Sequence, residues 1–335
     1  MTVLITGAAG FIGMSCAAAL LARGDTVVGI DNLNAYYDPA LKKARLARLA
    51  DHDRFRFEKI DVADAAAVAR IVNDLPDGSA VLHLAAQAGV RYSLENPGAY
   101  LETNVRGQLA ILEAVRHHGG IRHLTYASSS SVYGGNTKLP FAVEDRVDRP
   151  ISLYAATKRS AELMSWCYAH LYGLPQTGLR YFTVYGPWGR PDMSAYIFAR
   201  AILNGEPIPV FNHGDMRRDF TFIDDIVAGT LAALDRTPGT EGGTEDGAAE
   251  NGAPPHRLYN LGNNRPEALM DFIGEIEKAC GRKAVLEMQP MQPGDVRETC
   301  ADIDASVRDL GFSPKTTIAE GIPRFVAWFR DYHRL

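Results

Sequence analysis

The alternation of short apolar segments with longer amphipathic ones constrains the fold of this chain more than any other feature of its sequence. Five segments in the first half read as strands, because they are short and rich in apolar and β-branched residues: TVLITG, TVVGID, FRFEKID, AVLHLAA and HLTYASS. Between most of them the apolar residues recur at helical spacing, as in residues 11–23 and 63–74. Apolar strands that alternate with helices form a buried parallel sheet with helices on both faces. The sequence therefore predicts a doubly wound α/β fold, to which TGLRYF (177–182) adds a further strand.

The regular alternation ends near residue 186. Several prolines between residues 187 and 209 interrupt the pattern and the later strands are isolated, which predicts a smaller mixed α/β lobe. Residues 218–234 read as a strand and a helix that return to the main sheet. The expected division is a first domain of residues 1–185 joined by 217–263, and a second lobe of residues 186–216 and 264–335.

Composition disfavours several functional classes. The net charge of −5 argues against binding to nucleic acid or to an anionic membrane, and no apolar run is long enough to span a bilayer. The four cysteines form no CxxC motif, so we expect free thiols, no metal site and a reducing, cytoplasmic environment. The first strand begins at residue 2, so no signal peptide is expected. Residues 238–255, rich in glycine, proline and acidic residues, predict a flexible surface loop without a functional role.

Three glycines follow the first strand and open the first helix. Gly7, Gly10 and Gly13 allow a tight turn, in which backbone N–H groups can approach a pyrophosphate at the start of the helix. Asp31 ends the second strand, where a carboxylate can accept both hydroxyls of an adenosine ribose and would repel a 2′-phosphate. The alternative for Asp31 is a solvated turn residue. Taken together, the pattern favours NAD over NADP.

Two further strand ends are candidates for cofactor contacts. Asp61 and Val62 close the third strand, where an adenine amino group could bind. The small residues of 84–88 close the fourth strand, and they would let a flat cofactor lie against the backbone. Close packing between helix and strand explains these small residues equally well.

A tyrosine and a lysine four residues apart supply the candidate chemistry. Tyr154 and Lys158 share one helix face, and the pair is the only YxxxK in the chain. A free tyrosine has a pKa of about 10, which a neighbouring ammonium and a nicotinamide cation would lower. The run 128–131 follows the fifth strand at the carboxyl edge of the sheet, where a serine could relay the proton of a sugar hydroxyl to Tyr154. A serine run can also be simply a polar loop.

Together these motifs resemble the extended short-chain dehydrogenases/reductases, which share a Rossmann fold. The resemblance covers nearly the whole chain, because the following motifs occur in the order of that family: GAAGFIG, LAAQA, TNVRG, SSSSVYG, YAATK, LRYFTVYGP and RRDFTFIDD. Within the family, three segments are most similar to the UDP-glucuronate 4-epimerases: LAAQAGVRYS (84–93), VDRPISLYAATK (147–158) and RYFTVYGPWGRPDM (180–193).

The resemblance assigns roles to individual positions. It implies a catalytic set of Ser129, Tyr154 and Lys158. It places around NAD the residues Gly7, Gly10, Phe11, Ile12, Gly13, Asp31, Asn32, Asp61, Val62, Leu84, Ala85, Ala86, Gln87, Asn104, Tyr154, Lys158 and Tyr181. It places around the UDP-sugar the residues Arg91, Ser129, Ser130, Ser131, Thr183, Arg190, Val210, Phe211, Arg218, Asp295 and Arg297.

The activity that the resemblance implies is NAD-dependent C4 epimerisation of UDP-glucuronate to UDP-galacturonate through a 4-keto intermediate, an isomerase reaction of carbohydrate metabolism. Relatives that dehydrate or decarboxylate carry an acidic residue just before VYG, and residues 129–131 contain none. A UDP-glucose-type 4-epimerase, a UDP-xylose-forming decarboxylase and a non-catalytic NAD sensor remain alternatives. Arg91, Thr183 and Arg190 argue against the first, and the retained Tyr154 and Lys158 argue against the last. By the same resemblance we expect a homodimer.

Overall fold

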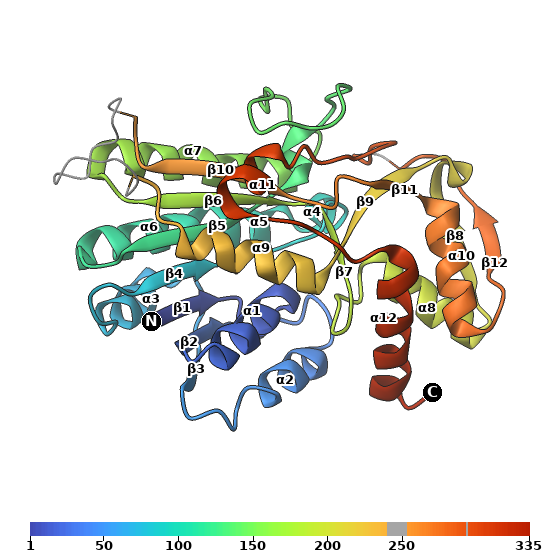
Figure 1. Cartoon of the computed structure of the whole chain (residues 1–335), viewed down its shortest axis with the longest axis horizontal. Coiled ribbons are helices and arrows are strands. Elements are labelled where there is room, and N and C mark those ends of the chain that lie inside the picture. Colours follow the sequence, from blue (N-terminus) through green and yellow to red (C-terminus); the bar gives the residue numbers. More distant parts are fainter. Residues whose placement is uncertain (240–252, 293) are drawn as a thin grey trace.

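The structure is a computed structural model that describes residues 1–239, 253–292 and 294–335. Its centre is a seven-stranded parallel sheet in the order β10-β6-β5-β4-β1-β2-β3 (Figure 1). The strands are β1 (Thr2–Thr6), β2 (Thr26–Asp31), β3 (Phe55–Lys59), β4 (Ala80–His83), β5 (His123–Ser129), β6 (Gln176–Tyr181) and β10 (His256–Leu261). The predicted doubly wound fold is confirmed.

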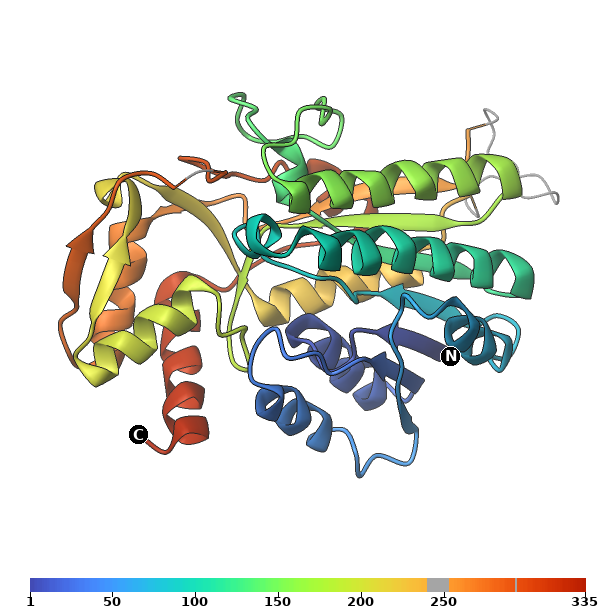
Figure 2. The ribbon, with the colours of Figure 1, turned by 180° about the vertical axis from the view of Figure 1, so that it is seen from behind.

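Helices cover both faces of this sheet, which explains why its strands are apolar throughout. Along β1, the side chain of Leu4 packs with α3 and α6, whereas those of Val3 and Ile5 pack with α1. Figure 2 shows the α6 and α7 side of the molecule. The helices of this part are α1 (Phe11–Ala22), α2 (Pro39–Ala47), α3 (Ala65–Asn73), α4 (Tyr92–Glu95), α5 (Pro97–Tyr100), η1 (Leu101–Arg106), α6 (Gly107–His118), η2 (Ser130–Tyr133), α7 (Leu153–Tyr172) and α9 (Ile223–Asp235).

The strand order reverses between β1 and β4, which are neighbours in the sheet although two strands separate them in sequence. Loops that follow such neighbouring strands diverge to opposite faces and leave a crevice at the carboxyl edge of the sheet, where ligands of this architecture bind. The glycine turn after β1 and the small residues after β4 both lie at this point. The fold therefore brings the predicted cofactor motifs together.

The second lobe packs beside the carboxyl edge of the sheet and has its own small sheets. One has three strands in the order β11-β9-β7, and the other pairs β12 with β8. A cluster of aromatic side chains fills the lobe, including Phe220 and Phe272, whose rings stack at 3.8 Å. Its elements are β7 (Thr183–Tyr185), α8 (Ser194–Asn204), β8 (Pro207–Val210), η3 (Phe211–Gly214), β9 (Arg217–Phe222), β11 (Pro266–Ala268), α10 (Leu269–Cys280), β12 (Val285–Met288) and α12 (Ile318–His333). The helix α11 (Asp304–Leu310), expected in this lobe, packs instead on α9 and β10 of the first domain.

One expectation about strand connectivity is wrong. The strand predicted within residues 218–234 does not return to the main sheet: β9 pairs with β7 and β11 in the smaller sheet. The reason is that β7 leaves the main sheet after Tyr181 and offers β9 a parallel partner there. The helix α9 and the strand β10 do return to the first domain, because α9 packs on α1 and β10 pairs with β6 in the main sheet.

Most of the loop predicted at residues 238–255 lies outside the described residues. In the part of the chain that the structure describes, no helix is both long and apolar enough to cross a membrane.

Candidate active site

A cavity of about 740 Å³ opens between the carboxyl edge of the main sheet and the second lobe. The turns after β1, β2, β4 and β5 line it on the sheet side, and β7, η3 and residues 294–296 line it on the lobe side. Its size suits a ligand or cofactor site.

The glycine turn is shaped by backbone and not by side chains. Gly7 has φ +72°, and a Cβ on it would lie 2.8 Å from the backbone nitrogen of Ala85. A Cβ on Gly13 would overlap the carbonyl oxygen of Gly7. Gly10 is the N-cap of α1, and its side-chain-free backbone leaves the first N–H groups of that helix open to the cavity. The turn therefore fits a pyrophosphate.

The end of β2 fits an adenosine ribose. The Asp31 carboxylate accepts the N–H of Ala9 at 3.2 Å and the N–H of Leu33 at 2.8 Å, so it is fixed at the cavity wall. Lys42, which is buried, lies near Asp31 and donates to Asn34 Oδ1 at 2.9 Å. Burial lowers the pKa of Lys42, and the Asp31 charge opposes that shift.

Gln87, after β4, presents a polar group without a protein partner. Among the described residues, nothing accepts a hydrogen bond from its buried side-chain Nε2. Its backbone is held by Asn104, which accepts from the Gln87 N–H at 2.8 Å and donates to the Gln87 carbonyl at 3.0 Å. A buried amide that is pre-positioned but unpaired fits a cavity built for a polar ligand. With the glycine turn and Asp31, it supports the expected NAD site.

The predicted catalytic residues meet at the end of β5 and the start of α7. Burial raises the pKa of Tyr154, and the Ser129 hydroxyl and the Arg190 guanidinium oppose that shift. Burial lowers the pKa of Lys158 to about 8. Lys158 Nζ donates to the carbonyl of Ala127 at 2.9 Å. Ser129 and Arg190 therefore join the groups that lower the pKa of Tyr154, and the effect that we expect from the Lys158 ammonium stays a prediction.

A buried ion pair anchors this catalytic corner. Glu162, one turn after Lys158 on α7, pairs with Arg180 on β6 at 2.8 Å, and both side chains are 1% exposed. The hydroxyl of Ser128 donates to Glu162 at 2.6 Å. The pair thereby fixes the serine run to the helix that carries Tyr154. Sequence reasoning did not single out Glu162 or Arg180.

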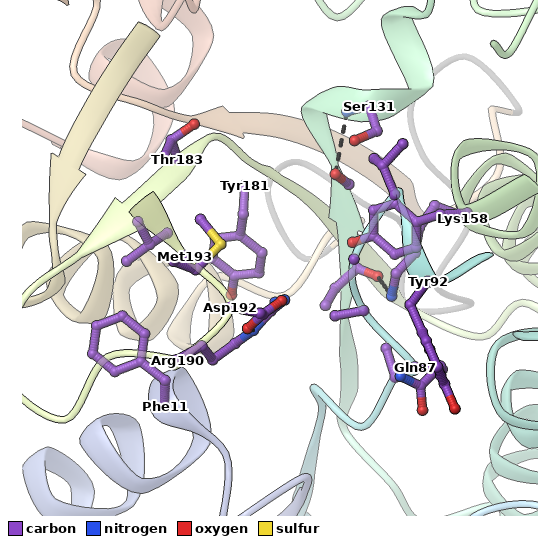
Figure 3. Close-up of a pocket in the computed structure, with 18 of the residues that line it drawn as sticks. Phe11, Gln87, Tyr92, Ser131, Lys158, Tyr181, Thr183, Arg190, Asp192 and Met193 are labelled. Atoms are coloured by element: carbon purple, nitrogen blue, oxygen red, sulfur yellow. Dashed lines mark hydrogen bonds and ion pairs between the residues drawn. The ribbon is translucent and has the colours of Figure 1, made fainter. Parts of the chain in front are cut away.

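The end of the cavity away from the glycine turn is lined largely by residues of the second lobe, of which Figure 3 labels Thr183 and Met193. Thr183 begins β7 and lies at the cavity wall. The Arg91 guanidinium lies 4.6 Å from the Phe211 ring centroid. Arg218 pairs with Asp295 at 2.7 Å, and burial lowers the pKa of Arg218. The cavity thus ends in an aromatic surface and two arginines.

The structure brings nearly all of the predicted site residues to one cavity, but four do not line it: Asp61, Asn104, Val210 and Arg297. Asp61 accepts from the side chain of Asn32, which does line it, at 2.9 Å. Asn104 lies behind Gln87, and Val210 is buried. The Arg297 side chain is 72% exposed and pairs with Asp215.

Sequence reasoning missed an ion pair in the cavity. Arg190 pairs with Asp192, whose carboxylate also accepts from the hydroxyl of Tyr36 at 3.0 Å. All three residues line the cavity. Asp192 lies in the segment RPDM that the sequence analysis quoted. Its partner Tyr36 lies in the loop after β2, far from RPDM in the sequence, so no motif spacing could indicate their contact.

Arg45 is a second omission. It is fully buried and donates to the backbone carbonyls of Ala9, in the glycine turn, and of Trp188. A lone arginine in an amphipathic helix reads as a solvent-facing residue, so no sequence signal marked it.

No metal centre is evident in the described part of the chain, where no three His, Cys, Asp or Glu side chains form a group that could hold an ion.

Comparison with known proteins decides the family. Residues 3–244 match the NAD dependent epimerase/dehydratase family. The chain belongs to this family. A UDP-glucuronate 4-epimerase of Arabidopsis thaliana is 46% identical over 99% of this chain and 77% of its own length. A probable UDP-glucuronate 4-epimerase of Rhizobium meliloti is 46% identical over 100% of this chain and 98% of its own.

A solved structure extends the comparison to three dimensions. The UDP-glucuronic acid 4-epimerase of Bacillus cereus, in complex with UDP-glucuronic acid and NAD, is 31% identical and superposes with a TM-score of 0.88. The match covers 99% of this chain and 100% of that protein. The epimerase/dehydratase resemblance expected from the motifs is therefore confirmed over the whole chain.

Proposed function

We propose that this epimerase/dehydratase family member converts UDP-glucuronate to UDP-galacturonate by NAD-dependent epimerisation at C4. The observation that carries the proposal is the position of Arg190: its guanidinium lines the cavity close enough to Tyr154 to lower the pKa of that hydroxyl. A base for a hexose hydroxyl and a cation for a hexose carboxylate therefore face the same small volume. The relatives that act on UDP-glucuronate support this choice of substrate.

Tyr154 and Ser129 would perform the proton chemistry. Tyr154, as phenolate, takes the O4 proton of the sugar, while the Ser129 hydroxyl bonds the same oxygen. Bound NAD would supply the acceptor and then the donor for the C4 hydride. The sugar becomes a 4-keto intermediate, and Tyr154 returns the proton once the hexose presents its other face. Arg218 and Asp295 would hold the diphosphate end during that rotation.

The intermediate is a β-keto acid, so the site must keep its carboxylate from leaving as CO2. Ser130 and Ser131 offer hydroxyl donors, Thr183 a third, and Arg190 a cation. The segment 129–132 contains no carboxylate that could act as an acid for elimination. These features favour epimerisation over decarboxylation.

Incubation with UDP-glucuronate, followed by proton NMR of the sugar, tests the proposal. We expect UDP-galacturonate at equilibrium without net NADH, and an inactive Tyr154→Phe variant that still binds NAD. UDP-xylose or a persistent keto sugar would contradict the epimerase assignment. Conversion of UDP-glucose alone would contradict the assignment of the acid sugar.

We also propose a homodimer through the outer faces of α7 and α6. The exposed apolar side chains there are Leu109, Leu163, Trp166, Leu171 and Tyr172. Light scattering of the purified chain should give twice the mass of one subunit. A cytoplasmic location is proposed on a separate ground, the four free cysteines.

A further inference from the structure

The Arg190–Asp192 pair has a specific geometry. Arg190 Nε donates to Asp192 Oδ1 at 3.0 Å and Nη2 donates to Oδ2 at 2.5 Å, so the carboxylate occupies one side of the planar guanidinium. The side chains are 25% and 28% exposed, and both line the cavity. Figure 3 shows the pair across the cavity from Lys158 and Ser131.

Asp192 is itself held in place from another part of the chain. The Tyr36 hydroxyl donates to Asp192 Oδ2, and the Tyr36 ring packs on Tyr92 with centroids 4.8 Å apart. Gly89 leaves room for that hydroxyl, since a Cβ there would lie 2.6 Å from it. The loop after β2 and the turn after β4 therefore hold the Asp192 carboxylate in place, and this carboxylate in turn orients Arg190.

The pairing leaves one edge of the guanidinium open. Arginine has five N–H donors, and Asp192 uses Nε and one N–H of Nη2. In the described part of the chain no hydrogen bond from Nη1 is found, so the edge formed by Nη1 and Nη2 is not taken up by Asp192, and it belongs to a side chain that lines the cavity. An edge of this kind binds a carboxylate through two parallel hydrogen bonds.

We propose that Asp192 is a positioning residue that aims the free edge of Arg190 at the hexose carboxylate, and that Tyr36 holds Asp192 in that role. The inference rests on the proposed function. With Asp192 in place, the guanidinium can rotate neither toward Tyr154 nor away from the sugar. Asp192 thereby controls whether the 4-keto acid is reduced or loses CO2.

The electrostatics agree with this arrangement. The Arg190 charge lowers the pKa of Tyr154 and the Asp192 charge raises it, so both groups act on the catalytic hydroxyl. Arg190 also holds the pKa of Asp192 below its usual range against the effect of burial, so the carboxylate stays charged at neutral pH.

The Asp192→Asn variant separates the orientation of the Arg190 guanidinium from its charge. An asparagine has the same shape, but it can accept only through one oxygen and it turns an N–H₂ group toward the guanidinium. Arg190 keeps its cation and loses its orientation. We expect kcat for UDP-glucuronate to fall at least tenfold, KM to change less than threefold, and the share of substrate released as CO2 to rise. Tyr36→Phe should change all three in the same direction but less.

Asp148→Asn is the matched control. Arg146 and Asp148 form an ion pair with the same Arg-x-Asp spacing, but their side chains are 87% and 49% exposed and lie outside the cavity. This variant should behave as wild type. UDP binding and the thermal midpoint, measured on every variant, report whether the fold is intact.

The wild-type reaction tests the proposed function by itself, and the variants test the inference. An Asp192→Asn enzyme with unchanged kcat and unchanged CO2 release would overturn it. A change in KM without a change in kcat would also overturn the inference, because it would mean that Asp192 affects only the charge of the site. A loss of kcat with an equal loss of UDP binding would overturn it as well, because it would mean that Asp192 has a structural role.

Discussion

The glycine turn at residues 7–13 and the loop at residues 186–193 both contribute residues to the wall of the same cavity, and they are built by opposite means. The turn depends on missing side chains, because a Cβ at Gly7 or Gly13 would meet backbone. The loop depends on side chains that arrive from elsewhere. Trp188 has φ +67°, a conformation that a non-glycine residue keeps only when its surroundings hold it there.

Arg45 holds Trp188 in this conformation and joins the loop at residues 186–193 to the glycine turn. Its guanidinium donates to the carbonyl of Trp188 at 2.7 Å, to that of Gly189 at 3.1 Å, and to that of Ala9 in the glycine turn at 3.1 Å. One fully buried cation therefore joins the glycine turn to the loop at residues 186–193. The comparison teaches that the first region is specified locally and the second by long-range contacts.

The largest expected effect comes from a substitution in the glycine turn, and it tests whether missing side chains determine the shape of that turn. Gly13→Ala places a methyl group against the Gly7 carbonyl, where backbone must move, at a cost of about 3 kcal/mol or more. We expect loss of bound NAD and a lower thermal midpoint, measured by cofactor content after purification and by calorimetry.

Gly274→Ala provides the control for that prediction. This glycine lies inside α10, and a Cβ there meets nothing within 4 Å. Alanine should be neutral or stabilise the helix by up to about 1 kcal/mol. Equal behaviour of the two variants would show that the turn is not sterically constrained.

The second effect tests the long-range specification. Arg45→Met leaves three backbone carbonyls without their buried donor, which should lower the free energy of unfolding by on the order of 3 kcal/mol. Urea unfolding measures the loss, and affinities for NAD and UDP should both fall. If only one of them fell, the two regions would not be joined through Arg45.

Arg48→Met is the matched control on the same helix end. Arg48 is exposed, and its guanidinium lies 5.1 Å from the Trp188 ring centroid. An exposed contact of this kind is worth about 0.5–1 kcal/mol. A loss as large as that of Arg45→Met would point to Trp188 stacking as the main support of the loop.

The smallest expected effect is a dependence of the free energy of unfolding on pH, caused by one buried histidine. His123, on β5, donates from Nδ1 to the carbonyl of Leu234 and accepts at Nε2 from the Thr177 hydroxyl, both at 2.9 Å. Burial lowers its pKa to about 4 from an ordinary 6.5. The unfolded chain therefore binds the proton more strongly, and stability is lost as the pH falls from about 6.5 toward 4.

Replacing His123 by Asn should flatten that dependence, which urea unfolding between pH 4 and pH 8 would measure. The exposed His117, replaced in the same way, is the control and should leave the slope unchanged. An unchanged slope in the His123 variant would place the acid sensitivity elsewhere, for example at His83 or His256, whose pKa values burial also lowers.

The same division explains what the sequence could predict. Glycines, small residues and the YxxxK spacing carry their chemistry within a few positions, so Gly7, Asp31 and Tyr154 were predicted and all line the cavity. Tyr36 and Asp192 are far apart in sequence and meet only because the loop after β2 folds back over the cavity. The strand β9 was misplaced for the same reason, since its partner β7 leaves the main sheet without any local signal.

The position of Trp188 has an optical consequence. The chain has three tryptophans, of which Trp166 is about half exposed, while the rings of Trp188 and Trp328 contact each other at a tilt of 47° with centroids 5.3 Å apart. Trp188 lies two residues before Arg190, on the loop that we propose to contact the sugar. A shift of that loop on binding would change the emission of this pair, so intrinsic fluorescence would follow occupancy of the sugar end without a label.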